Sequence, residues 1–130
     1  MSDHSANHVI RGSEATEMGR TDGGSFRLVQ REELGLGEVA VGVSDNPPGI
    51  DGFVHRHSCG EVFVVVEGRG VYTVDDEEIV AGPGDMVIIP PNTWHTFRPA
   101  GDQRLRHVAV YDAGKIDIEL ASRPGESFDL

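Results

Sequence analysis

Two histidines separated by a single residue, His55 and His57, are followed four residues later by Glu61. Side chains two apart project to the same side of a β-strand and cannot share a helix face, so this spacing predicts a strand. At a rise of about 3.3 Å per residue, the two Cα atoms lie about 6.6 Å apart, a span across which two imidazoles can converge on one ion. Glu61 can close on the same point. His95 must reach it from a different strand, because more than thirty residues separate it from Glu61.

The glycines and prolines around these residues extend the pattern into two motifs. The first fits G-x5-H-x-H-x3,4-E-x6-G, and the second fits G-x5-P-x-G-x2-H-x3-N except that Asn92 replaces the inner glycine and Pro99 the closing asparagine. Asn tolerates positive φ better than most residues, so we expect the turn before His95 to be kept. The matching residues are Gly49, His55, His57, Glu61 and Gly68, then Gly84, Pro90 and His95. In both motifs the chain resembles a small single-domain cupin.

The resemblance to cupins implies an all-β fold, a double-stranded β-helix or jelly-roll barrel with the site at its mouth. It also implies that His55, His57, Glu61 and His95 bind one divalent transition metal ion. Imidazole and carboxylate donors suit Mn, Fe, Co, Ni or Zn, whereas Ca and Mg prefer oxygen ligands. Glu61 has a second role open to it in such a site, as a catalytic base that leaves the ion.

Short apolar runs between turn residues organise the rest of the chain. Seventeen glycines and seven prolines separate these runs, a spacing typical of all-β proteins. The predicted domain organisation is a flexible N-terminal arm over residues 1–24, a β-barrel over 25–120 and a C-terminal tail over 121–130. The expected strands are 25–30, 38–44, 53–57, 61–67, 70–75, 77–80, 86–89, 95–98, 105–111 and 115–120, with one short helical turn within 32–37.

Strand parity indicates which other side chains face the site. His107 is a candidate catalytic acid or base, with a surface position as the alternative. Cys59 shares the parity of the ligands, but we interpret it as a small buried residue rather than a fifth ligand. Four apolar residues share parity with the expected ligands and are candidates for the substrate pocket, with ordinary core packing as the alternative: Phe53, Phe63, Val65 and Phe97.

Composition restricts the partners and the compartment. Aspartate and glutamate outnumber lysine and arginine by 22 to 11, which gives a formal net charge of −11 and disfavours nucleic acid and anionic membranes as partners. A single cysteine excludes an internal disulfide and fits a reducing cytoplasm. The first residues contain no apolar run, so we expect no signal peptide, and no segment approaches the length of a membrane span.

The function that these features favour is that of a small metalloenzyme acting on a polar small molecule in the barrel. A dioxygenase-like reaction and an isomerase-, decarboxylase- or cyclase-like reaction both fit, because each uses a metal that holds a substrate oxygen. The alternative is a binding module without turnover, in which the metal holds a ligand or stabilises the fold. By resemblance to small cupins, we also expect a homodimer.

Overall fold

The computed structural model describes residues 8–20 and 22–130. Its two short helices are η1 (Gly12–Glu14) and α2 (Arg31–Leu34). The strands are β1 (Thr16–Met18), β2 (Ser25–Val29), β3 (Ala40–Asn46), β4 (His55–Arg56), β5 (Glu61–Glu67), β6 (Gly70–Val74), β7 (Glu77–Ala81), β8 (Met86–Ile89), β9 (His95–Pro99), β10 (Leu105–Tyr111), β11 (Asp117–Leu120) and β12 (Ser127–Asp129). Within the described residues, no helix has the length and apolar character needed to span a membrane.

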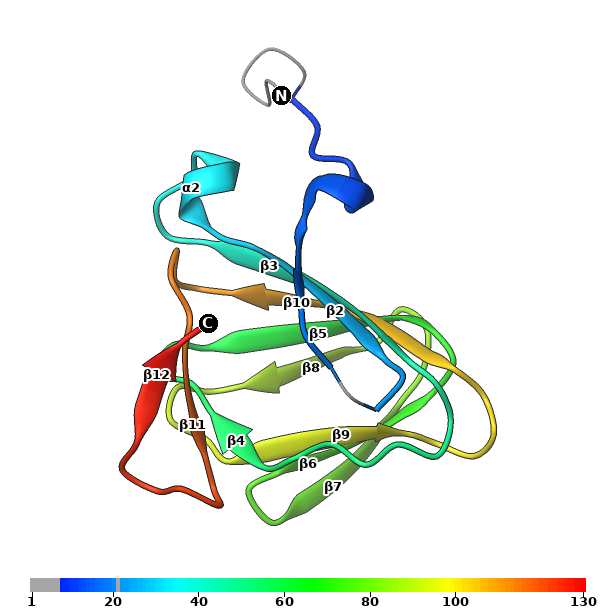
Figure 1. Ribbon diagram of the computed structural model, residues 1–130. Coiled ribbons are helices and arrows are strands. Elements are labelled where there is room, and N and C mark those ends of the chain that lie inside the picture. The colour runs from blue at the N-terminus through cyan, green and yellow to red at the C-terminus, as the bar shows by residue number, and fades with distance from the viewer. Residues whose placement is uncertain (1–7, 21) are drawn as a thin grey trace.

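The strands form two antiparallel sheets that face each other (Figure 1). One sheet has the order β1-β2-β3-β10-β5-β8, and the other has the order β12-β11-β4-β9-β6-β7. Neighbours within a sheet are often far apart in the sequence, as in the pairing of β10 with both β3 and β5. The predicted all-β jelly-roll fold is confirmed.

Alternating side chains along the strands create the interior of the barrel. In β10, four residues from Leu105 to Tyr111 are buried in alternation with Arg106, Val108 and Val110, which face outward. The same alternation places Glu61, Phe63 and Val65 of β5 inside. Because a strand has a side-chain period of two, these residues must share the interior face of their sheet.

The interior of the barrel contains one apolar cluster, which lies between the two sheets. Its buried members are Leu28, Ala40, Phe63, Val65, Tyr72, Ala81, Val87, Ile89, Leu105, Ala109, Tyr111 and Ile116. Aromatic rings and branched side chains thus surround the polar groups described below, so any charge placed among them is poorly solvated.

Two strands lie in segments that the sequence predicted to be an arm and a tail. β1 pairs with β2, with Thr16 opposite Leu28, and β12 pairs with β11, with Phe128 opposite Ile118. Each is three residues long and has no apolar run of its own, so no local sequence pattern predicts it. Each forms because its backbone hydrogen-bonds to the edge of a neighbouring strand. Residues 1–7 of the expected arm lie outside the described residues.

Turn geometry agrees with the residues that the two motifs place there. Asn92 adopts a positive φ of 59°, as expected for a replacement of glycine before His95. Gly68 also has a positive φ, 78°, in the tight connection between β5 and β6. Pro99 ends β9 and pairs in register with Gly70, so it closes the strand without shifting His95.

Candidate metal centre

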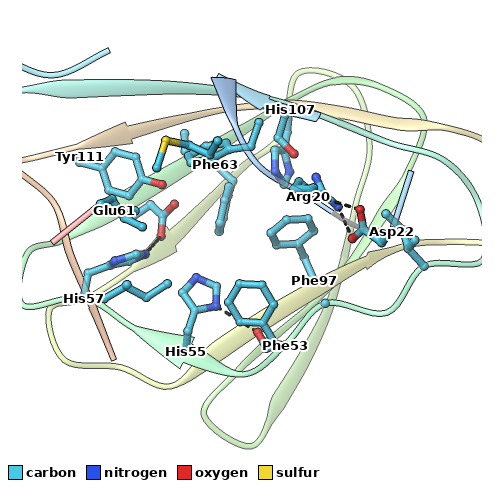
Figure 2. A pocket seen from close by; sticks show the side chains of 18 of the residues that line it. Arg20, Asp22, Phe53, His55, His57, Glu61, Phe63, Phe97, His107 and Tyr111 are labelled. Atoms are coloured by element: carbon cyan, nitrogen blue, oxygen red, sulfur yellow. Dashed lines mark hydrogen bonds and ion pairs between the residues drawn. The ribbon is translucent and has the colours of Figure 1, made fainter. Parts of the chain in front are cut away.

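Three strands bring four expected ligands to one point between the sheets. His55 in β4 lies directly across from His95 in β9, and His57 follows β4 by one residue. Glu61 begins β5 in the opposite sheet, and its Oε1 lies 3.1 Å from Nε2 of His95 and 3.5 Å from Nε2 of His57. The ligand nitrogens of the three histidines all lie within 4.8 Å of one another. Figure 2 shows the side chains of His55, His57 and Glu61 converging on this point.

Backbone carbonyls orient all three imidazoles in the same way. Nδ1 of His55 lies 3.0 Å from the carbonyl oxygen of Phe53, and Nδ1 of His95 lies 2.8 Å from that of Thr93. Nδ1 of His57 lies 2.6 Å from the carbonyl oxygen of Asp117 in β11. A carbonyl can only accept, so each Nδ1 carries the proton and each Nε2 presents its lone pair to the interior. This is the tautomer that a metal-binding histidine requires.

The surroundings of His55 and His57 favour the neutral form of their imidazoles. Burial, reinforced by the nearby His95 and His57 rings, lowers the pKa of His55 to about 3. Burial also lowers the pKa of His57, against the opposing effects of Glu61 and the Asp117 carbonyl. A neutral ring is the form that binds a metal. Metal binding near neutral pH therefore does not have to displace a proton from His55.

A metal ion fits the polar atoms that the protein leaves without partners. Within the described residues, Nε2 of His57, Nε2 of His95 and Oε1 of Glu61 are buried and make no hydrogen bond. Leaving a polar atom unsatisfied in the interior costs roughly 1–3 kcal/mol, so three that face the same point indicate a missing partner. Neutral imidazole lone pairs and a carboxylate oxygen are together a donor set for a divalent transition metal ion.

Three of the four expected ligands belong to the wall of a cavity of about 270 Å³ between the sheets. His55, His57 and Glu61 line it, so an ion held by them is reached from the cavity. Most of the remaining wall is apolar, with contributions from Ile50, Ile118, Phe26, Met18 and the three phenylalanines discussed next.

Three of the four predicted pocket residues line this cavity. Phe63 and Phe97 lie in its wall with their ring centroids 5.5 Å apart, and Phe53 lies at the mouth with 61% of its surface exposed. Val65 has the parity of Phe63 but lies further along β5, in the apolar core and not in the cavity wall. Parity therefore identified the correct face of the strand but not the depth of each residue along it.

His107 is buried and lines the same cavity, away from the other three histidines (Figure 2). Its Nδ1 lies 2.7 Å from the hydroxyl of Tyr72, and its ring stacks on Phe63 at a centroid distance of 4.6 Å. Burial, and then the positive charge of Arg20, lowers the pKa of His107 to about 3. His107 is thus a neutral hydrogen-bonding group rather than a cation, and the surface position considered for it is wrong.

Cys59 remains a thiol in this setting. Burial, followed by the carboxylates of Asp112, Asp117 and Glu61, raises the pKa of the Cys59 thiol to about 11. Its side chain packs against the core, and the cavity wall does not include it. Cys59 is therefore a small residue that packs against the core, as expected, but it is half-buried rather than fully buried.

Sequence reasoning missed several polar residues of the cavity, among them Tyr111 and Arg20. Burial, and then the neighbouring Glu61, raises the pKa of Tyr111 well above its ordinary value, and its ring meets that of His57 edge-on at 5.4 Å. Its parity with His107 on one strand was the available signal. Arg20 also lines the cavity, but it lies in the segment expected to be an arm, and no local pattern marks it. Only the pairing of β1 with β2 brings Arg20 to the barrel.

Comparisons with known proteins agree with this architecture. The model of the cupin domain matches residues 42–111, more than half of the chain. Over 82 residues the chain is 30% identical to an acireductone dioxygenase from Exiguobacterium sibiricum, and the match covers 55% of this chain and 46% of that protein. The chain therefore spans less than half the length of this relative.

Solved structures show the same fold. Oxalate decarboxylase from Lactobacillus farciminis, in a formate complex, superposes with a TM-score of 0.77 at 16% identity, over 84% of this chain and 34% of that one. A cupin-like protein from Thermotoga maritima superposes with a TM-score of 0.63 at 27% identity, over 70% of this chain and 69% of that one.

Proposed function

From the membership of this chain in the cupin domain family, which the match over residues 42–111 shows, we propose that it is a metal-dependent enzyme of the dioxygenase type. Its substrate is a small organic molecule that presents an oxygen donor to the ion. The observation that carries the proposal is the position of the ligands in the wall of a largely apolar cavity. An ion bound there meets whatever the cavity holds, whereas a purely structural metal has a closed set of protein ligands.

The size and lining of the cavity limit the substrate. A water molecule occupies about 30 Å³ in the liquid, so 270 Å³ corresponds to roughly nine waters, or a ligand of about ten non-hydrogen atoms. The rings of Phe63 and Phe97 favour a flat, unsaturated or aromatic body. The acireductone dioxygenase relative supports oxygen chemistry over the other reactions that the fold can host.

The protein's own residues supply binding and orientation. His55, His57, His95 and Glu61 would hold the ion through Nε2 and carboxylate oxygen atoms. When bound, such an ion polarises a substrate oxygen and supplies the electron transfer that reactions of dioxygen require. Tyr111 lies next to Glu61, and burial raises the pKa of its hydroxyl, which keeps it protonated as a hydrogen-bond donor toward that carboxylate. The aromatic wall excludes water from the reacting atoms.

Metal analysis of three matched proteins tests the assignment. Wild type, His57→Ala and His107→Gln are purified without a nickel column or chelator and submitted to elemental analysis. We expect about one equivalent of a redox-active transition metal in wild type and in His107→Gln, and loss of the metal in His57→Ala. Full occupancy in His57→Ala, or no metal in wild type, would contradict the ligand set.

Oxygen uptake then separates the enzyme from the binding module. The metal-loaded protein is screened for oxygen consumption with small phenols, enols and aromatic acids. Consumption that is lost in His57→Ala and dependent on one compound class supports the dioxygenase. Binding of such compounds with no oxygen consumption and no turnover would instead favour the module without activity.

We also propose that two copies pair through the outer face of the first sheet. Apolar side chains cover its outward positions over four adjacent strands: Val41, Val43, Val62, Val64, Val66, Met86, Ile88, Val108 and Val110. Met86 and Ile88 are 67% and 69% exposed. The four strands that carry these side chains are about 4.8 Å apart and up to about 20 Å long, so the apolar area is roughly 400 Å², about half of the roughly 800 Å² per partner of a stable interface. These nine apolar side chains place no charge at the contact, which reduces the repulsion between two chains with a net charge of −11 each.

A further inference from the structure

The cavity has a second polar end, away from the metal ligands. In Figure 2, Arg20, Asp22 and His107 lie on one side of the cavity, and His57, Glu61 and Tyr111 lie on the other. The rings of Phe63 and Phe97 lie between the two groups. A ligand that fills the cavity therefore contacts a polar group at each end and aromatic surface in the middle.

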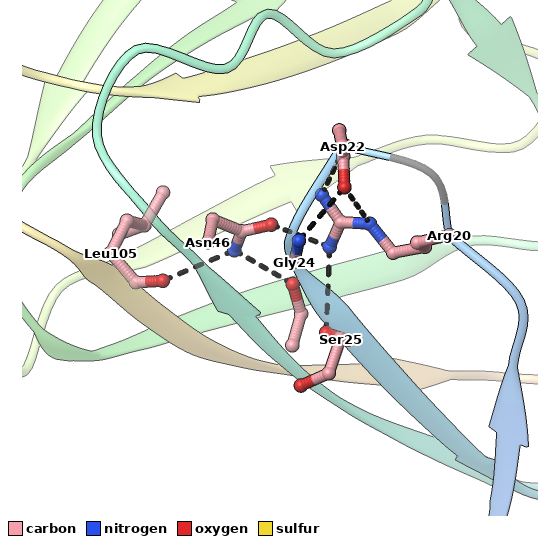
Figure 3. Close-up of polar contacts among 7 residues, drawn as sticks. Arg20, Asp22, Gly24, Ser25, Asn46 and Leu105 are labelled. Carbon is pink, nitrogen blue, oxygen red and sulfur yellow. Dashed lines mark hydrogen bonds and ion pairs between the residues drawn. The ribbon is translucent and has the colours of Figure 1, made fainter.

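Arg20 is held rigidly at this second end (Figure 3). Its Nε and Nη2 donate to the two carboxylate oxygens of Asp22 at 3.0 and 2.7 Å. Its Nη1 donates to Oδ1 of Asn46 at 2.7 Å and to the carbonyl oxygen of Ser25 at 3.4 Å. Gly24 lies directly against the guanidinium, where a Cβ atom would come within 2.5 Å of its central carbon. The backbone thus leaves room for the guanidinium and four acceptors fix its orientation.

One donor of Arg20 has no acceptor among these contacts. A guanidinium carries five N–H groups, and the four hydrogen bonds above use four of them. The remaining N–H is on Nη2, in a side chain that lines the cavity. Because Asp22 balances its charge, Arg20 acts on a ligand as an oriented donor rather than as an isolated cation.

His107 supplies a second donor at the same end. Tyr72 is fully buried, and among the described residues its hydroxyl has His107 Nδ1 as its partner. A buried hydroxyl hydrogen requires an acceptor, so Tyr72 donates to Nδ1 and the proton of the neutral ring lies on Nε2. A β-bulge between Arg106 and His107 alters the register of β10 on β5 at this position.

We propose that Arg20 and His107 form a subsite for an sp² oxygen acceptor, a carbonyl or a carboxylate, on the part of the ligand furthest from the metal. This subsite rests on the proposed function only for the metal ion at the opposite end of the cavity. It adds to that function the chemical class of the substrate. That class is a compact unsaturated or aromatic molecule with an oxygen donor at one end and a carbonyl or carboxylate oxygen at the other.

Three phenols of similar size test the subsite directly. 4-Ethylphenol has no distal acceptor, 4-hydroxyacetophenone has a neutral carbonyl, and 4-hydroxybenzoate has a carboxylate. Binding is measured by calorimetry on zinc-loaded protein, which avoids turnover, and again on metal-free protein. We expect 4-hydroxyacetophenone or 4-hydroxybenzoate to bind wild type at least about tenfold more tightly than 4-ethylphenol, as a hydrogen bond to a charged donor predicts. The tighter of the two identifies the natural acceptor as neutral or anionic.

Variants separate binding from a purely structural role of Arg20. In Arg20→Gln we expect the preference for the acceptor-bearing phenol to fall to near one, and in Tyr72→Phe to fall partly, because His107 loses its orienting partner. Arg27→Gln is the matched control, since Arg27 lies on the same hairpin, pairs with Glu17 and does not line the cavity. If thermal denaturation shows that Arg20→Gln is not folded, Arg20→Lys is used instead. It keeps the positive charge but not the planar set of guanidinium donors, so the same loss of preference is expected.

The outcomes distinguish this subsite from the proposed function. Loss of the preference in the Arg20 variants but not in Arg27→Gln, with or without metal, supports the subsite even if the protein proves to lack oxygenase activity. Equal binding of the three phenols to wild type, or a preference that persists in both Arg20 variants, would overturn the subsite. Neither of those results changes the metal content or the oxygen uptake on which the proposed function depends.

Discussion

Four buried histidines of one chain present their Nε2 atoms in two different protonation states because their Nδ1 atoms meet different partners. In His55, His57 and His95 the partner is a backbone carbonyl, which holds the proton on Nδ1 and leaves Nε2 free to bind a metal. In His107 the partner is a hydroxyl, which places the proton on Nε2. The element and the burial are similar, so the hydrogen-bond partner decides the role.

Replacement of Glu61 by glutamine tests its part in the metal site. Glu61→Gln keeps the volume but replaces an anionic oxygen with a weaker, neutral donor, so we expect metal affinity to fall at least about tenfold, as measured by competition with a chelator. Glu67→Gln, at the exposed end of the same strand, should leave affinity unchanged. Equal affinity of wild type and Glu61→Gln would remove Glu61 from the ligand set.

Protonation of His107 should make the metal-free protein less stable in acid. Its pKa is about 3 in the fold, below the ordinary value of 6.5, so the unfolded chain binds the proton first. The stabilising effect is complete above about pH 6.5 and is lost as the pH falls toward 3, with a slope of up to about 1.4 kcal/mol per pH unit. Denaturant unfolding of wild type and His107→Gln between pH 7 and pH 4 measures it. Parallel curves for the two proteins would contradict the shift.

Among the elements, the tight connection between β5 and β6, which joins the two sheets, depends on Gly68. A Cβ atom there would collide with the carbonyl oxygen of Arg104, and φ is positive. Gly84 also has positive φ, but the space around it is open. We expect Gly84→Ala to cost about 1 kcal/mol from backbone strain alone, and Gly68→Ala to cost at least about 2 kcal/mol, because the backbone of the β9–β10 loop must also move. Chemical denaturation compares the two, and similar losses would show that the collision is relieved cheaply.

At the scale of the whole molecule, the outer face of the first sheet predicts self-association. Ile88→Glu places a charge on the apolar face, at its β8 edge, without touching the interior, since Ile88 points outward from β8. We expect wild type to be a dimer and this variant a monomer by light scattering at micromolar concentration, with unchanged metal content. Glu78→Lys in β7, on the other sheet, is the control for a change of charge alone. A monomeric wild type, or a dimeric Ile88→Glu, would exclude this face as the interface.

Local patterns determined most of the strands and the ligands. Short apolar runs bounded by turn residues specified the strands Glu61–Glu67, Met86–Ile89 and Leu105–Tyr111 to the residue. The spacing of His55 and His57 placed both on one side of a strand, and the family motif added Glu61 and His95.

Only the tertiary structure decided how far from the metal each cavity residue lies. Val65 and Phe63 have the same parity, yet one is in the core and the other lines the cavity, because depth depends on how the two sheets close over each other. Arg20 reaches the barrel through the pairing of β1 with β2, a contact between short strands that no apolar period predicts. Residue types and spacing therefore determined the metal site and the fold. The second polar end of the cavity arose from long-range strand pairing, which places residues together without a local signal in the chain.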